Sequence, residues 1–133
     1  MTVREGASLN HLDIVARGAA ITVLHVDDDA AFVDLAATFL ERESSSIRVL
    51  TETTVEEGRA ALDEHDVDCV VSDYDMPGKN GLEFLETVRE RDPELPFVLF
   101  TGKGSEEIAS EAISAGVTEY LQKERGTDQY AVL

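Results

Sequence analysis

Residues 21–28 read ITVLHVDD, a short apolar run, rich in β-branched residues, that ends directly in an acid pair. Three later stretches repeat this order of an apolar run and then a polar group: VVSD at 70–73, VLFTG at 98–102 and YLQK at 120–123. Segments with helical periodicity separate the runs, which is typical of parallel strands whose carboxyl ends meet at one edge of a sheet. Open α/β sheets bind ligands at that edge, so these polar groups are predicted to share a site.

Strands and helices alternate along the rest of the chain. Five strands are predicted, at Ile21–Val26, Ile47–Leu50, Val67–Ser72, Phe97–Phe100 and Glu119–Gln122. Four helices are predicted: Ala30–Arg42, Val55–Glu64, one defined by Leu82, Leu85 and Val88, and one that follows Ser105 and ends at Gly116. Right-handed crossovers between such elements build a parallel sheet covered on both faces. The expected fold class is α/β, a three-layer doubly wound five-stranded parallel sheet.

The spacing of apolar residues predicts which helix faces contact the sheet. In the first helix this face comprises Phe32, Leu35, Ala36, Phe39 and Leu40, and in the fourth it comprises Ile108, Ala112, Ile113 and Ala115. Asp29 and Ser105 are placed to cap these two helices.

The two ends of the sequence are expected to differ from the domain between them. Residues 1–20 are predicted to precede the domain, as a disordered extension or a short amphipathic helix. The domain is expected to span 21–133. Residues 128–133 look like the start of a fifth helix, which is expected to be truncated, in a fragment of a longer protein. An incomplete last helix would leave an apolar strip that favours partner contacts, including a homodimer.

Charge limits the classes of partner. The chain has 28 acidic and 11 basic residues and a formal charge of −17, which opposes direct binding to nucleic acid. Most acids fall on predicted helix faces, as a solvated coat would. We therefore hypothesise that this protein works in a high-salt cytoplasm, so its melting temperature should rise between dilute and molar KCl. The alternative is an ordinary acidic protein.

Cysteine content and hydropathy indicate the compartment. Cys69 is the sole cysteine, so no internal disulfide is expected, and its place in a strand predicts a small buried hydrophobe. No apolar stretch approaches the roughly 20 residues that span a bilayer, and the N-terminus lacks a signal-peptide core. A cytoplasmic protein without a membrane partner is expected.

The acids at the ends of the first and third strands predict a metal site. Asp27, Asp28 and Asp73 can converge on Mg²⁺, which prefers oxygen ligands and keeps several waters, and the backbone carbonyl of Asp75 can complete the protein ligands. Without a cation these carboxylates would repel one another.

The same edge carries the groups needed for phosphoryl transfer to a carboxylate. Asp73 is the expected nucleophile, because a carboxylate can attack phosphorus to give an acyl phosphate. Thr101 supplies a hydroxyl and Lys123 a point charge for the phosphoryl oxygens, and Gly102 leaves space for the group to arrive.

In their order, these motifs resemble the receiver domain of two-component response regulators, between about Ile21 and Lys123. The residues that carry the resemblance are Val26-Asp27-Asp28, Asp73-Tyr74-Asp75-Met76-Pro77 with Gly81, Thr101-Gly102, and Lys123. The resemblance implies a flavodoxin-like fold with strand order 2-1-3-4-5. It also implies phosphoryl uptake from a sensor histidine kinase or phosphotransfer domain, and a shift in the fourth-helix face that a downstream output module or protein reads.

The resemblance also assigns roles to single residues. Asp73 becomes the phosphoacceptor, Asp28 a direct metal ligand and Asp27 a ligand through water. Thr101 becomes the switch hydroxyl and Lys123 the phosphate contact. Such a domain catalyses only its own phosphorylation and dephosphorylation.

Tyr120 matches the switch aromatic of receivers, and is expected to turn inward when Thr101 moves; the alternative is a half-buried strand tyrosine without a signalling role. Two features depart from the family pattern. Glu124 stands where receivers usually have proline, which leaves the following loop less constrained. In receivers, the positions of Asp75 and Lys103 lie over the phosphoryl group and vary in residue type. Asp75 is expected to repel the product or to bind an attacking water, and so to change the lifetime of the acyl phosphate, whereas Lys103 is expected to attract phosphate.

Two other functions stay open on the sequence alone. Asp73-Tyr74-Asp75 also fits the nucleophile motif of haloacid-dehalogenase-type phosphatases, although that family places its extra acids after the nucleophile. A receiver-like scaffold that is not phosphorylated is the third candidate. His25 is expected to be a packed strand residue rather than a phosphodonor.

Overall fold

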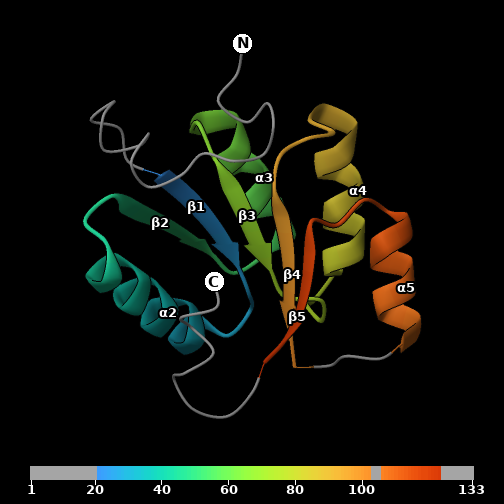
Figure 1. Cartoon of the computed structure of the whole chain (residues 1–133), viewed down its shortest axis with the longest axis horizontal. Helices are drawn as coiled ribbons and strands as arrows, with labels where there is room; N and C mark the ends of the chain where they lie inside the picture. The colour runs from blue at the N-terminus through green and yellow to red at the C-terminus, as the bar shows by residue number, and fades with distance from the viewer. Residues whose placement is uncertain (1–20, 103–105, 124–133) are drawn as a thin grey trace.

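The computed structural model describes residues 21–102 and 106–123, in which strands and helices alternate (Figure 1). The strands are β1 (Ile21–Val26), β2 (Ile47–Glu52), β3 (Cys69–Ser72), β4 (Phe97–Thr101) and β5 (Glu119–Gln122). The helices are α2 (Ala30–Glu43), α3 (Val55–Glu64), α4 (Gly81–Arg91) and α5 (Glu106–Ser114).

All five strands are parallel and lie in the order β2-β1-β3-β4-β5, so the predicted fold class and strand order are confirmed. The expected N-terminal extension, the Ser105 cap, Lys103, the loop after Lys123 and the start of a fifth helix lie outside the described residues.

Alternation along the strands divides the core between the two faces of the sheet. Leu24 and Val26 of β1 belong to a buried cluster that also takes side chains from α3, α4 and α5. His25, between them in β1, is buried on the other face against Phe32 of α2. Figure 1 shows the result as three layers, with α2 on one face and α3 and α4 on the other.

The turn into α2 has the predicted cap. Asp29 has extended backbone angles, and its carboxylate accepts a hydrogen bond from Phe32 N at 3.1 Å. That bond satisfies one of the amide groups that a helix leaves without an internal partner. The prediction for Asp29 is confirmed, and it fixes where the chain turns just beyond the end of β1.

The prediction that a residue faces the sheet is wrong at two positions. Leu35 is 51% exposed and Ile113 is 69% exposed. In α2 the buried row is Val33, Ala36 and Leu40, and Leu35 lies about 200° around the helix from Val33. In α5 only Ala112 is fully buried among the described helix residues, and Ile113 is turned about 100° from it.

The predicted strand bounds shift by one or two residues. β2 continues to Glu52 and β4 to Thr101, whereas β3 begins at Cys69 rather than at Val67. The late start of β3 has a local cause, because a carboxylate oxygen of Asp68 accepts the hydrogen bond from Thr22 N at 2.8 Å. A side chain thus takes the place of a backbone carbonyl at the beginning of the ladder.

The surface agrees with the predicted acid coat. The exposed glutamates on the helices include Glu56, Glu57, Glu86, Glu90, Glu106, Glu107 and Glu111. The dependence of stability on salt stays a prediction. Cys69 is half-buried, and burial raises the pKa of its thiol to about 11, so it packs as a neutral side chain. Across residues 21–102 and 106–123, every helix is too short or too polar to cross a membrane.

Candidate functional site

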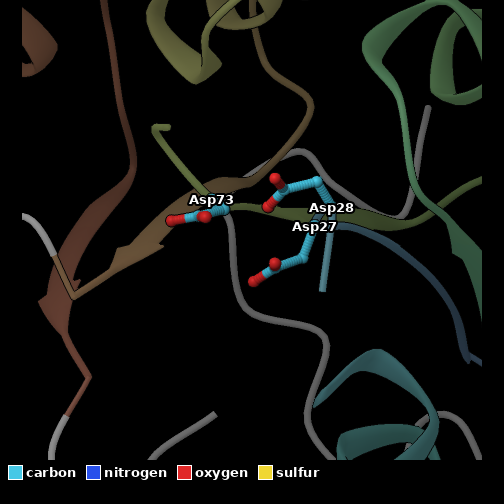
Figure 2. A group of neighbouring side chains, drawn as sticks. All are labelled: Asp27, Asp28 and Asp73. Atoms are coloured by element: carbon cyan, nitrogen blue, oxygen red, sulfur yellow. The ribbon is translucent and has the colours of Figure 1, made fainter. Parts of the chain in front are cut away.

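Three carboxylates meet where β1 and β3 end. Oxygens of Asp27, Asp28 and Asp73 all lie within 4.8 Å of one another. Figure 2 shows Asp27 and Asp28 together beyond β1, with their carboxylates on the side of Asp73. Asp27 is 1% exposed and Asp73 8%, whereas Asp28 is exposed. The predicted convergence of these three residues is therefore observed.

The backbone ladder holds these acids in register. Asp73 N donates to Val26 O at 2.9 Å, and Asp27 N donates to Glu52 O at 3.1 Å, so the pairing of β3, β1 and β2 continues past the last strand residues. The carboxylate of Asp27 then accepts from Asp29 N at 2.9 Å, which bends the chain toward α2.

Gly81 allows the loop after Asp73 to close against the end of β3. A Cβ at this position would lie 2.2 Å from the carbonyl oxygen of Asp73 and 3.0 Å from Tyr74 Cα. Gly81 N also donates to Tyr74 O at 2.8 Å. Only glycine permits this approach of two backbones. The loop that carries Asp75 is thereby fixed beside Asp73.

Lys123 brings the one cation that contacts the acid cluster within the described part of the chain. Its Nζ lies 2.6 Å from Asp27 Oδ2 and 3.7 Å from Asp73 Oδ1. The backbone of Lys123 is set by β4, since Lys123 N donates to Thr101 O at 2.9 Å. The ammonium points into the cluster and is nearer to Asp27 than to the predicted nucleophile.

Burial is the main influence on the charge of Asp73. It raises the pKa of this carboxyl, and the neighbouring charge of Asp27 raises it further. Lys123, the Thr101 hydroxyl and the backbone amide of Tyr74 oppose the rise, the last through a hydrogen bond of 2.8 Å to Oδ1. The carboxylate is thus poorly solvated, and each favourable partner comes from the carboxyl end of a different strand.

These residues surround an open pocket of about 330 Å³. Its lining comprises Asp27, Asp28, Asp29, Asp73, Asp75, Thr101, Gly102 and Lys123. Every described residue that was predicted to act on a phosphoryl group lies on this pocket. Asp29 was predicted only as a helix cap, and its place on the lining follows from the turn that it caps.

The donor set fits a magnesium ion. Three carboxylates lie within reach of one centre, and hard oxygen ligands are those that Mg²⁺ prefers. Asp27 is the least available for direct contact, because its Oδ1 accepts from Asp29 N and its Oδ2 pairs with Lys123. Asp28 and Asp73 are better placed as direct ligands.

Tyr120 lies apart from the pocket, in β5, where it is in register with Leu99 of β4. Its ring is half-buried and packs against the core cluster of the α3, α4 and α5 face. Its hydroxyl is buried and has no hydrogen-bond partner among the described residues.

An aromatic residue that was predicted only as core lies in contact with the site. The Nζ of Lys123 is 4.4 Å from the centroid of the Phe32 ring. Helical spacing placed Phe32 on the sheet-facing side of α2, and nothing in that spacing indicated an ammonium over the ring. His25 packs edge-on against the same ring, is 1% exposed, and has its pKa lowered by burial to about 4, so the packed role predicted for it is confirmed.

Comparisons with known proteins identify a family and similar proteins. A family model described as the response regulator receiver domain matches residues 23–131. The hydrogenase transcriptional regulatory protein HoxA of Cupriavidus necator is 39% identical over 103 residues, which cover 77% of this chain and 21% of HoxA. The chain therefore spans about a fifth of the length of that curated relative.

Solved structures have the same fold. A CheY-like receiver domain protein from Methanospirillum hungatei superimposes with a TM-score of 0.76 at 28% identity, over 81% of this chain and 85% of that one. The response regulator TrrA of Thermotoga maritima, solved in complex with Mg²⁺ and beryllofluoride, has a TM-score of 0.73 at 25% identity, over 84% of this chain and 94% of that one.

Proposed function

The chain belongs to the response regulator receiver domain family, the phosphoaccepting domains of two-component signalling, and we propose that Asp73 is its phosphoacceptor. One observation carries the proposal. Asp73 lies in a pocket with two further carboxylates within 4.8 Å and with the Lys123 ammonium 3.7 Å from its Oδ1. The chain is a signalling domain rather than a catalytic enzyme, so the alternative of a haloacid-dehalogenase-type phosphatase is not taken further.

The proposed reaction joins Asp73 to phosphorus. A carboxylate oxygen of Asp73 attacks the phosphorus of the donor and forms a P–O bond, while the bond from phosphorus to the donor breaks and its electron pair leaves with the donor. On a histidine kinase or phosphotransfer domain the bond that breaks is P–N.

Two side chains contact the phosphoryl oxygens in this proposal. The Thr101 hydroxyl, which already forms a hydrogen bond with the Asp73 carboxylate, donates to one phosphoryl oxygen. The Lys123 ammonium pairs with another phosphoryl oxygen. Gly102 lines the pocket with no side chain and leaves room for the group. Lys103 is proposed to attract the incoming phosphate, and it lies outside the described residues.

We propose that Asp28 and Asp73 hold Mg²⁺ directly, with Asp27 through water and the Asp75 carbonyl as the third protein ligand. When bound, the ion neutralises charge on the phosphoryl oxygens. TrrA, solved with Mg²⁺ and beryllofluoride, supports this choice of metal by similarity.

Thr101 and Tyr120 form the proposed switch. Movement of Thr101 toward a phosphoryl group opens space beside β4, and the Tyr120 ring turns inward to fill that space. The Tyr120 hydroxyl is buried and has no partner in the part of the chain that the structure describes. This supports a second position for the ring, because an unsatisfied hydroxyl costs about 1–3 kcal/mol. The partner would read the surface near α5 and β5 that this movement changes.

The proposed partners are proteins. A sensor histidine kinase or phosphotransfer domain supplies the phosphoryl group, and a downstream output module or protein, or a second copy of this chain, reads the switched face. The charge of −17 disfavours direct contact with nucleic acid. A cytoplasmic location is also proposed, as expected from the sequence.

The test is incubation with acetyl phosphate and Mg²⁺, followed by intact-mass measurement. The proposal predicts the mass increase of one phosphoryl group, absent from Asp73→Asn and retained in Asp66→Asn, an exposed aspartate that precedes β3 at the other edge of the sheet. Mass unchanged in the presence of Mg²⁺ would instead favour a scaffold that is not phosphorylated, and equal labelling of Asp73→Asn would place the acceptor elsewhere.

A further inference from the structure

Among the described residues, the ammonium of Lys123 has an aromatic neighbour besides the two carboxylates. Its Nζ pairs with Asp27 Oδ2 at 2.6 Å, lies 3.7 Å from Asp73 Oδ1, and stands 4.4 Å from the centroid of the Phe32 ring. That last distance is within the range in which a ring face attracts an ammonium. The lysine side chain is only 20% exposed, so water weakens the attraction less than at an open surface.

The Phe32 ring is itself held by aromatic packing on two sides. His25 of β1 meets it edge-on, with centroids 5.6 Å apart and planes at 78°. Phe100 of β4 lies 5.9 Å away with a tilt of 39°. Both of these neighbours are 1% exposed. The ring is therefore a fixed surface beneath the ammonium, built from the strands on either side of β3.

Asp27 and Phe32 differ in how they hold the ammonium. The hydrogen bond to Asp27 directs Nζ toward one oxygen, and it must lengthen if Nζ is to follow the negative charge of a phosphoryl group joined to Asp73. A ring face attracts the ammonium without fixing its direction, so it retains contact while Nζ moves over the pocket.

We propose that Phe32 is a positioning residue for phosphoryl uptake, which keeps the Lys123 ammonium over the pocket as it shifts from Asp27 toward the group on Asp73. This inference rests on the proposed function of Asp73 and adds a residue on α2 to that site. Phe32 touches neither the phosphoryl group nor the reacting carboxylate; it acts through Lys123.

A spectroscopic test on the unphosphorylated protein examines the contact by itself. The side-chain protons of Lys123 should show an upfield ring-current shift in the NMR spectrum, which Phe32→Leu removes and Phe32→Tyr retains. Identical Lys123 shifts in the wild-type protein and in Phe32→Leu would overturn the proposal, whatever the phosphorylation assay shows.

A kinetic test examines the positioning role. Replacing Phe32 with increasingly fluorinated phenylalanines weakens the ring's attraction for a cation at nearly constant size. The rate of acetyl phosphate uptake should fall stepwise, by about 3- to 10-fold across the series. In Lys123→Met the dependence on fluorination should disappear, and the same series at Phe84, a core ring that pairs with Phe97, should be flat.

The outcomes separate this inference from the function on which it rests. If the wild-type protein is labelled at Asp73 but the Phe32 series is flat, or falls equally in Lys123→Met, the positioning role is wrong and the phosphoacceptor stands. If the wild-type protein takes up no phosphoryl group, both fall together.

Discussion

The ammonium of Lys123, just after β5, donates a hydrogen bond of 2.6 Å to Asp27 Oδ2, just after β1 and 96 residues earlier in the chain. This pair neutralises Asp27, the most deeply buried acid of the cluster, and occupies the Oδ2 atom that could otherwise bind a metal ion. The pocket is therefore partly charge-balanced before a metal ion binds.

Lys123→Met should show how much the pair with Asp27 contributes to the free energy of unfolding. Removing one partner of a largely buried pair leaves the carboxylate of Asp27 uncompensated, and the free energy of unfolding in metal-free buffer should fall by about 2 kcal/mol. Mg²⁺ should stabilise this variant more than the wild-type protein, because the ion then meets three carboxylates without an ammonium. Urea denaturation with and without Mg²⁺ measures both effects.

Lys79→Met is the matched control, since Lys79 is exposed in the loop after β3. Its unfolding free energy should stay within about 0.5 kcal/mol of the wild-type value. Equal losses in the two variants would show that the pair with Asp27 does not stabilise the fold.

Gly81→Ala should disrupt the site through the backbone. Its Cβ would lie 2.2 Å from the carbonyl oxygen of Asp73, so the loop or the end of β3 must move. We expect a loss of about 3 kcal/mol in unfolding free energy and a strong decrease in phosphoryl uptake. Gly102→Ala is the comparison, because within the described residues a Cβ there meets only carbons of Lys123, at 3.9 Å. Thermal unfolding of both variants decides the point, and a well-tolerated Gly81→Ala would contradict it.

The stability of the metal-free protein should depend on the ionisation of Asp73. Its pKa in the folded state is raised above the ordinary value of 3.8, so the folded state binds this proton more tightly than the unfolded state does. Stability contributed by the protonated carboxyl is therefore present at pH below 3.8 and is lost as the pH rises through the raised pKa.

Asp73→Asn isolates this effect, because an amide does not ionise. The difference in unfolding free energy, variant minus wild type, should be smallest at low pH and grow as the pH rises through that window. Denaturation in EDTA across the pH range measures it. A difference that is independent of pH would show that the carboxyl of Asp73 titrates alike in both states.

Asp75→Asn should change the lifetime of the acyl phosphate without abolishing its formation. Asp75 is exposed on the pocket that holds Asp73, where its charge can repel the product or orient an attacking water. The half-life is measured by the loss of label after the phosphodonor is removed. Asp66→Asn should leave it unaltered, and an unchanged half-life in Asp75→Asn would refute the role of this carboxylate.

Much of the architecture follows from local patterns. α3 and β5 have the bounds that periodicity predicted, and Asp29 caps α2, because these features depend on residues close together in the chain. The helix faces were predicted less well. Leu35 and Ile113 are exposed because the sheet selects one row of each helix, and that choice depends on how the layers pack.

The site was predictable in its membership more than in its contacts. Parallel strands bring their ends to one edge, so the grouping of Asp27, Asp28, Asp73, Thr101 and Lys123 follows from topology. The nearest partner of Lys123 does not, because it depends on distances between side chains from strands far apart in sequence. The sequence likewise offered no signal that Phe32 would lie beneath the ammonium.

The most direct measurement is chemical trapping of the acceptor. An acyl phosphate on an aspartate is reduced by borohydride to homoserine, which peptide mass spectrometry locates. After incubation with acetyl phosphate and Mg²⁺, homoserine is expected at position 73 and at no other aspartate, and none is expected when Mg²⁺ is removed. Homoserine at a different position, or phosphoryl uptake that persists in Asp73→Asn, would contradict it.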